Sequence, residues 1–192
     1  MASGLNNPVA LAFTPSGTLT YVLTNSQLLT IPIGGGAPSV LAGQATAGYA
    51  VGQGTAAAFN LPSGLVVHPE TGVAYISDTY NYRIRTCTPL GYVSTLAGSG
   101  YSGSTSTNGP ALSATFARPF GIVMDSTYTY LYVVCSNGNT LRRVEVVSGY
   151  TTTVAGSGTA SGNDGTGLSA SFNGPTYEYR HICNSVYFVA LV

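Results

Sequence analysis

The sequence predicts an all-β protein built from about three and a half copies of one unit. A proline recurs every 54 to 57 residues, and a tyrosine follows each proline by twelve or thirteen residues. Three phenylalanines keep the same step, each three residues before the next proline. A fixed period of this length, in units rich in short apolar runs, is typical of repeat proteins whose units bury their faces against their neighbours. The landmarks are Pro8, Pro62, Pro119 and Pro175; Tyr21, Tyr75, Tyr132 and Tyr187; and Phe59, Phe116 and Phe172.

The unit that follows Pro62 shows how each repeat is expected to fold. Four runs of five or six residues, rich in β-branched and aromatic side chains, are separated by short turns containing Gly, Pro or Asn. The runs are apolar on both alternating faces, as expected for a sheet packed between two others. Radial stacking of such sheets gives a β-propeller with almost no helix. The predicted strands are antiparallel and lie at 64–68, 73–78, 82–87 and 92–97.

One repeat array is expected to span residues 1–192, with no second domain. Each phenylalanine landmark is expected to fill the seam between two blades with its large apolar side chain. The connections between blades also repeat a turn whose glycine is expected to have a positive φ, at Val51-Gly52, Asn108-Gly109 and Asp164-Gly165. The predicted four-stranded antiparallel blades lie at approximately 8–43, 62–98 and 119–156, with a partial blade at 175–192.

The second unit resembles the NHL repeat, whose propellers typically have six blades. The resemblance is carried by PSGLVVHPETGVAYISDTYNYRIRTCTPLGYVSTLAG, which begins at Pro62, and by linkers of the type NDGTGLSASFNGP. Blade 2 holds the fullest pattern, with Asp78, Asn81 and Arg83 between its second and third strands, whereas blade 3 has Cys135 in place of Asp78. We expect Asp78 and Arg83 to hydrogen-bond to each other or to the turn between them. The family includes protein-binding, glycan-binding or RNA-binding and a few catalytic members, so the resemblance implies a fold more than a function.

The end of each blade's first strand holds the residues best suited to a metal. Six residues after each repeat proline lie Thr14, His68, Asp125 and His181, which could surround one mouth of the central channel. Histidine and aspartate are zinc ligands, and some lyases of the resembling family bind a metal in their channel. Inner strands of neighbouring blades are far apart, however, and the aspartate also suits a turn at a strand end. We therefore favour the turn role, and expect no catalytic residue, cofactor or metal.

Three cysteines, Cys87, Cys135 and Cys183, show none of the close pairs that bind zinc. They fall at three different positions of the repeat. We expect small buried side chains and no disulfide, since no two should reach the Cα separation of about 4.4–6.8 Å that a disulfide requires.

Composition limits the partners. Only 6% of the 192 residues are charged, the formal net charge is zero, and all six basic residues are arginine. No basic stripe is available for a phosphate backbone, so we expect no nucleic-acid partner. The sequence shows neither a secretory leader nor an apolar run long enough to span a membrane. Its 25 glycines and many hydroxyl side chains are typical of extracellular or cell-surface β-proteins, which favours a chain that has lost its leader.

Three classes of function remain. The first is a non-enzymatic binding or scaffolding propeller that contacts proteins or glycans, and it is favoured because no catalytic motif occurs. The second is a structural subunit of an extracellular assembly, since three and a half blades cannot close a ring and open sheet edges bind other chains. The third is a metal-dependent enzyme with a channel site. Expected partners are other protein chains or copies of this chain that complete the open edges, and possible glycans.

Overall fold

The computed structural model describes residues 5–182 and 185–191, with side chains described as far as residue 176, and it consists almost entirely of strands. Four antiparallel sheets follow one another along the chain. Within the described ranges the helical segments are three 3-10 turns: η1 (Gly54–Ala56), η2 (Thr79–Asn81) and η3 (Gly167–Ser169). The expectation of an all-β chain is confirmed.

Each of the first three sheets contains a four-stranded meander in sequence order. Blade 1 comprises β1 (Pro8–Phe13), β2 (Leu19–Thr24), β3 (Leu28–Pro32) and β4 (Ser39–Ala42). Blade 2 comprises β6 (Gly64–Val67), β7 (Ala74–Asp78), β8 (Arg83–Cys87) and β9 (Tyr92–Ala97). Blade 3 comprises β10 (Pro119–Met124), β11 (Tyr130–Cys135), β12 (Thr140–Glu145) and β13 (Thr151–Ala155). A two-stranded sheet follows, made of β14 (Thr176–Ile182) and β15 (Ser185–Leu191).

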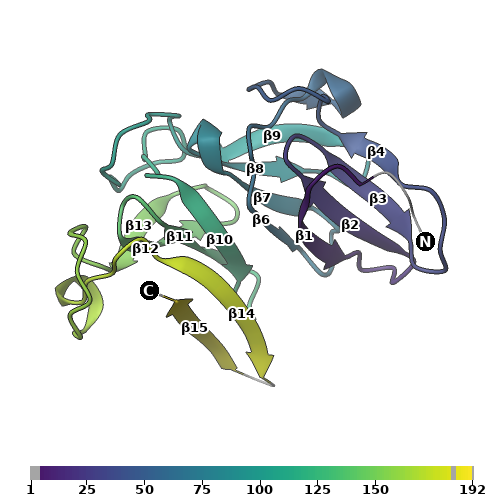
Figure 1. The fold of residues 1–192 in the computed structure, drawn as a ribbon. Coiled ribbons are helices and arrows are strands. Elements are labelled where there is room, and N and C mark those ends of the chain that lie inside the picture. Colours follow the sequence, from purple (N-terminus) through teal and green to yellow (C-terminus); the bar gives the residue numbers. More distant parts are fainter. Residues whose placement is uncertain (1–4, 183–184, 192) are drawn as a thin grey trace.

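The blades follow an arc, with their first strands β1, β6, β10 and β14 on its inner side (Figure 1). Each first strand contacts the next one along the arc. This is the architecture of a partial β-propeller. The strands of blade 2 lie within one residue of the four segments expected from the sequence, so that prediction is confirmed.

The connection between blades runs along the outer edge of the following blade before it enters the inner strand. Here β5 (Gly52–Gln53) pairs with β9 and makes blade 2 five-stranded, and Gly109 forms the corresponding bridge to Thr151 of blade 3. Gly52 and Gly109 have φ values of 138° and 149°, as the repeated turn predicts. The prediction is wrong for Gly165, which is absent from the positive-φ residues and, unlike Gly52 and Gly109, forms no bridge to a described strand of the following sheet.

The landmark phenylalanines fill the seams between blades. Phe59 is fully buried among apolar side chains of blades 1 and 2, including Leu23 and Ile76. Phe116 takes the same position between blades 2 and 3. Phe172, which precedes the last sheet, is only half-buried. The seam role is therefore confirmed for the first two phenylalanines.

The cysteines lie at separate places, as expected. Cys87 ends β8 and Cys135 ends β11, and both thiols are buried and free. Cys183 lies outside the described residues. Burial raises the pKa of Cys87 to about 12. Burial likewise raises the pKa of Cys135 to about 11, although the neighbouring Arg142 lowers it.

No helix in the described part of the chain is long and apolar enough to cross a membrane.

Candidate functional site

Most of the residues considered as metal ligands follow the first strands of their blades. Thr14, His68 and Asp125 share one backbone pattern, in which each N–H donates to the carbonyl five residues later. His181 lies in β14 opposite Val186, and its side chain is outside the described part. The positions of Thr14, His68 and Asp125 are therefore equivalent on successive blades, as the repeat predicts, whereas His181 lies within its strand rather than after it.

The described members of this set use their side chains inside their own turns. His68 Nδ1 accepts hydrogen bonds from the backbone N–H of Glu70 and Thr71, at 3.2 and 3.4 Å. Asp125 Oδ1 accepts from the N–H of Thr129 and Tyr130, both at 2.9 Å. These hydrogen bonds show that each of the two side chains stabilises its own turn.

The charge of Asp125 is stabilised by that turn. Partial burial raises its pKa, but hydrogen bonds from Thr127, Tyr130 and Thr129 more than offset this, and the pKa lies below its usual value. The His68 ring lies 5.3 Å, centroid to centroid, from the ring of Tyr128 in the corresponding turn of blade 3. Among the described residues, no three His, Cys, Asp or Glu side chains are grouped closely enough to hold a metal ion.

The inner side of the arc is apolar where it is described. A groove of about 320 Å³ lies between the first strands of the three blades. None of its lining residues titrates, so this surface offers packing rather than acid–base chemistry. The lining residues are Leu11, Ala12, Phe13, Leu65, Val66, Val67, Ile122, Val123 and Met124.

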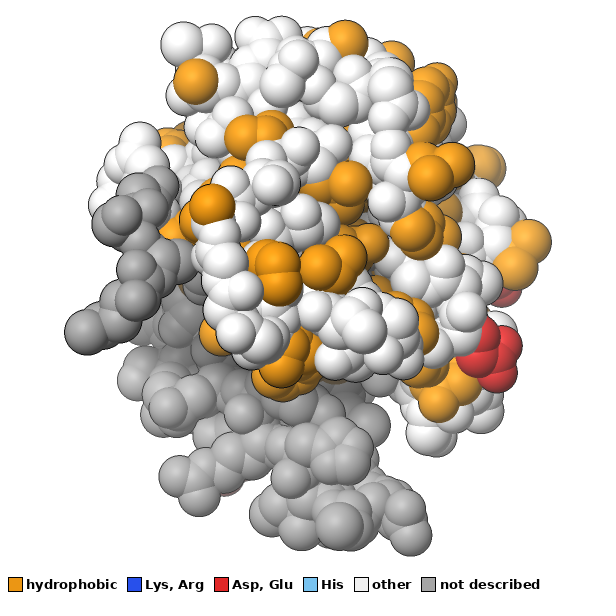
Figure 2. Space-filling view, turned by 90° about the vertical axis from the view of Figure 1, so that its right-hand side faces the viewer, with side chains coloured by type: hydrophobic (Ala, Val, Ile, Leu, Met, Phe, Trp, Pro, Cys, Tyr) orange, Lys and Arg blue, Asp and Glu red, His pale blue; other side chains and the backbone are white. Residues whose placement is uncertain are grey.

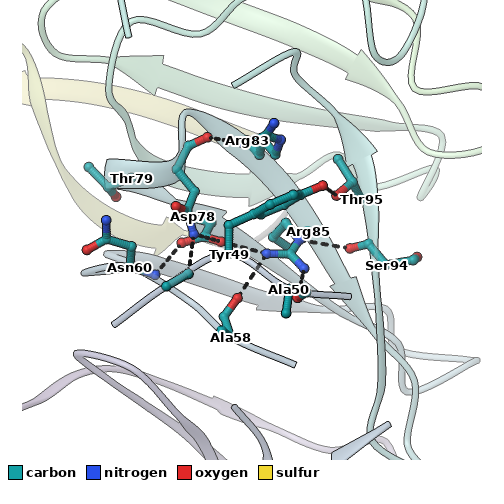
Figure 3. A network of polar contacts seen from close by, with 12 residues as sticks. Tyr49, Ala50, Ala58, Asn60, Asp78, Thr79, Arg83, Arg85, Ser94 and Thr95 are labelled. Atoms are coloured by element: carbon teal, nitrogen blue, oxygen red, sulfur yellow. Dashed lines mark hydrogen bonds and ion pairs between the residues drawn. The ribbon is translucent and has the colours of Figure 1, made fainter. Parts of the chain in front are cut away.

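Blade 2 contains a buried ion pair, between Asp78 and Arg85 rather than between Asp78 and Arg83 (Figure 3). Arg85 Nη1 lies 2.8 Å from Asp78 Oδ2, and both side chains are fully buried. Arg83 is half-buried at the start of β8 and donates to the carbonyls of Asn81 and Ser99. A buried carboxylate needs a partner at its own depth, which Arg85 provides and Arg83 does not. Of the two alternatives expected from the sequence, the bonds of Asp78 and Arg83 to the intervening turn are confirmed, and the structure shows no bond between these two described side chains.

Asp78 also forms hydrogen bonds with residues outside the ion pair. Its carboxylate also accepts from the Asn60 backbone N–H and from Asn81 Nδ2, both at 2.9 Å. Burial raises the pKa of Asp78, whereas these bonds and Arg85 act in the opposite direction. The group holds the preceding linker, the 3-10 turn and β8 together, which is a structural role.

An equivalent arginine holds the linker on blade 3. Arg85 donates to the carbonyls of Ala50 and Ala58, and Arg142 donates to the carbonyls of Thr107 and Thr115. Each acceptor in blade 3 lies 57 residues after its counterpart. Sequence reasoning missed this clamp, although the spacing of 57 between Arg85 and Arg142 could have revealed it.

The three blades share one row of directly opposite residues across their four strands. In blade 2 the row is Leu65, Ile76, Arg85 and Thr95, and it faces blade 1. In blade 3 the row is Ile122, Val133, Arg142 and Thr153. In blade 1 the row contains no polar side chain, because it consists of Leu11, Val22, Leu29 and Val40.

The row of blade 1 lies on an apolar face of that blade. Blade 1 covers the corresponding face of blade 2, but no described blade covers this face of blade 1. We call its exposed part the open face, formed by Val9, Leu11, Phe13 and Val40, whereas Val22 and Leu29 of the same row are buried. Leu11 is 62% exposed and Phe13 66%, whereas the equivalent Leu65 of blade 2 is 6% exposed. The side of the molecule seen in Figure 2 carries many apolar and few charged side chains. Contiguous exposed apolar surface is a common feature of interaction sites in proteins.

The fold is similar to that of several solved proteins. A structural genomics protein of unknown function from Bacteroides thetaiotaomicron superposes with a TM-score of 0.73 and 25% identity, covering 89% of this chain and 41% of that chain. An auxiliary nutrient binding protein from the same organism has a TM-score of 0.56 and 25% identity, with 66% and 34% covered. A chain of the nidogen/laminin complex has a TM-score of 0.57 and 16% identity, with 79% and 49% covered, which is a likeness of fold alone.

This chain thus spans less than half the length of each of these proteins. No protein-family model matches the sequence, and no curated protein matches it. The fold and its structural relatives place the chain among propeller-like β-proteins, of which at least one is described as a binding protein.

Proposed function

We propose that this chain is a non-enzymatic binding and scaffolding segment of an extracellular or cell-surface propeller of the NHL type, and that its open face packs against another blade. The open face is the observation that carries the proposal. The equivalent rows of blades 2 and 3 are covered by the preceding blade and its linker, so Leu65 and Ile122 are buried there, whereas Leu11 of blade 1 is 62% exposed.

The apolar chemistry of the open face supports a sheet as its occupant. In blades 2 and 3 the third residue of the row is an arginine that binds linker carbonyls, whereas blade 1 has Leu29. A surface without such a donor suits an apolar sheet face that brings no unpaired backbone groups. For the isolated 192-residue chain, the available sheet of this kind belongs to a second copy.

Sedimentation velocity over a range of concentrations tests the proposal. We expect the wild-type chain to associate reversibly in the micromolar range and Leu11→Asp to remain monomeric, because a carboxylate buried in an apolar interface is strongly disfavoured. Val147→Asp is the matched control, since Val147 is 97% exposed on a hairpin away from the open face. Association that is unchanged by Leu11→Asp, or a wild-type chain that remains a monomer, would overturn the proposal.

A further inference from the structure

Blade 3 contains a hydroxyl-lined cavity at the place where Tyr49 stacks on Arg83 in blade 2. Its volume is about 380 Å³, and it lies between the linker that precedes blade 3, strands β12 and β13, and the linker that follows. None of its lining side chains is charged. The lining residues are Ser104, Thr105, Ser106, Asn108, Gly138, Thr140, Thr153, Gly156, Ser157, Gly158 and Leu168.

The same region of blade 2 is filled by the protein's own side chains. The Tyr49 ring lies 3.9 Å from Arg83 Cζ and 4.8 Å from Arg85 Cζ, measured to the ring centroid. Its hydroxyl lies 3.2 Å from Thr95 Oγ1 (Figure 3). One aromatic ring and the arm of Arg83 therefore occupy this space.

Blade 3 keeps the linker-binding arginine but lacks the side chains that fill this space in blade 2. By the repeat alignment, Ser106 stands at the position of Tyr49 and Thr140 at that of Arg83, each 57 residues later. Thr153 corresponds to Thr95, because it lies opposite Arg142 as Thr95 lies opposite Arg85. All three blade 3 residues line the cavity. The cavity therefore lies at the position that the Tyr49 ring and the Arg83 side chain fill in blade 2.

The cavity wall presents polar groups that the protein does not fully use. The exposed Ser157 hydroxyl accepts from the Thr159 N–H at 3.3 Å, and its own O–H remains available to donate. Asn108 Oδ1 accepts from the Thr153 N–H and hydroxyl and from Arg142 Nη2, which fixes the amide and turns its nitrogen away from these donors. A hydroxyl that accepts one bond inside the protein and keeps its own proton can donate it to a ligand hydroxyl.

We propose that this cavity binds a neutral, polyhydroxylated ring, namely one sugar residue of a glycan. Serine and threonine hydroxyls both donate and accept, so they match sugar hydroxyls, and Leu168 adds apolar surface. An anion lacks a partner here, since Arg142 is fully buried and donates to linker carbonyls and Asn108. An aromatic ligand lacks the guanidinium that stacks on Tyr49 in blade 2, because Thr140 replaces Arg83. This proposal rests on the proposed binding function and assigns it a ligand class.

Saturation-transfer NMR with methyl glycosides of glucose, galactose, mannose and N-acetylglucosamine, and with p-cresol as the aromatic probe, tests the proposal. We expect saturable binding of at least one glycoside, with a Kd in the millimolar range. Ser106→Tyr and Thr140→Arg restore the filling of blade 2 and should weaken this binding at least about tenfold. The matched control, Ser113→Tyr, changes an exposed serine of the same linker outside the cavity and should bind as the wild type does.

Two outcomes would overturn the proposal: no glycoside binds saturably, or p-cresol binds more tightly than every glycoside. Binding that Ser106→Tyr leaves unchanged would also overturn it. If the larger substitutions unfold blade 3, Ser157→Ala removes an exposed cavity hydroxyl with little change of shape and should still weaken binding severalfold. Leu11→Asp should leave glycoside binding intact, so failure of this proposal and failure of the blade-docking proposal are distinguishable.

Discussion

Replacing Asp78 with threonine tests the buried ion pair of blade 2. The substitution leaves Arg85 fully buried without its carboxylate partner at 2.8 Å, and it also removes the acceptor for Asn60 N–H and Asn81 Nδ2. Loss of one member of a buried pair typically costs about 3–5 kcal/mol of unfolding free energy. We expect the cost to lie in this range, because the partners that Arg85 keeps, backbone carbonyls and the Tyr49 and Phe59 rings, carry no negative charge.

The double variant Asp78→Thr with Arg85→Leu should be milder than the single one. It installs the residues found at these positions in blade 1, Thr24 and Leu29, and leaves no buried charge. The carbonyls of Ala50 and Ala58 keep partners, because the two residues also exchange backbone hydrogen bonds. We therefore expect a loss of about 2 kcal/mol or less, since replacing a whole buried pair by apolar groups is often nearly neutral.

Urea unfolding followed by far-UV circular dichroism, at one protein concentration for all variants, measures both losses. A single variant that loses less than about 1 kcal/mol, or a double variant less stable than the single one, would refute the assignment of Asp78 to the charge of Arg85.

Two further predictions concern the seams and the thiols. Phe116→Ala should lower the free energy of unfolding by about 3–5 kcal/mol in the same assay, because Phe116 is fully buried. Phe172→Ala should cost clearly less, because Phe172 is only half-buried. Equal losses would contradict the seam geometry. Cys87 and Cys135 should resist iodoacetamide at pH 8 until the chain unfolds, since both thiols are buried with raised pKa values. Unfolded thiols ionise near pH 9 while folded ones stay protonated to about 11 or 12, so stability should fall above pH 9 by up to about 1.4 kcal/mol per thiol per pH unit. Substituting both by alanine should flatten that slope, and an unchanged slope would contradict the assignment.

The repeat landmarks predicted the fold because they are local. The Pro62 unit shows strands and turns directly in its residues, and Phe59 and Phe116 mark the seams by recurrence. The partner of Asp78 could not be found in this way, since Arg83 lies directly opposite it in register and the choice of Arg85 depends on depth.

The candidate sites were harder to predict from the sequence. His68 and Asp125 were placed correctly at equivalent strand ends, but their hydrogen bonds within the turns depend on backbone geometry. The cavity of blade 3 arises because small residues replace the Tyr49 and Arg83 side chains of blade 2. Only a comparison of the blades in three dimensions shows this cavity.

Hydroxyl-radical footprinting read by mass spectrometry tests the central claim most directly, because it reports the exposure of individual side chains on the open face. At low concentration, Leu11 and Phe13 should be strongly oxidised, as should Val147 on its distant hairpin. As concentration rises into the micromolar range, we predict that oxidation of Leu11 and Phe13 falls while that of Val147 stays constant. Oligomers that form while Leu11 and Phe13 remain fully reactive would show that the chain associates through another surface, and would contradict the account.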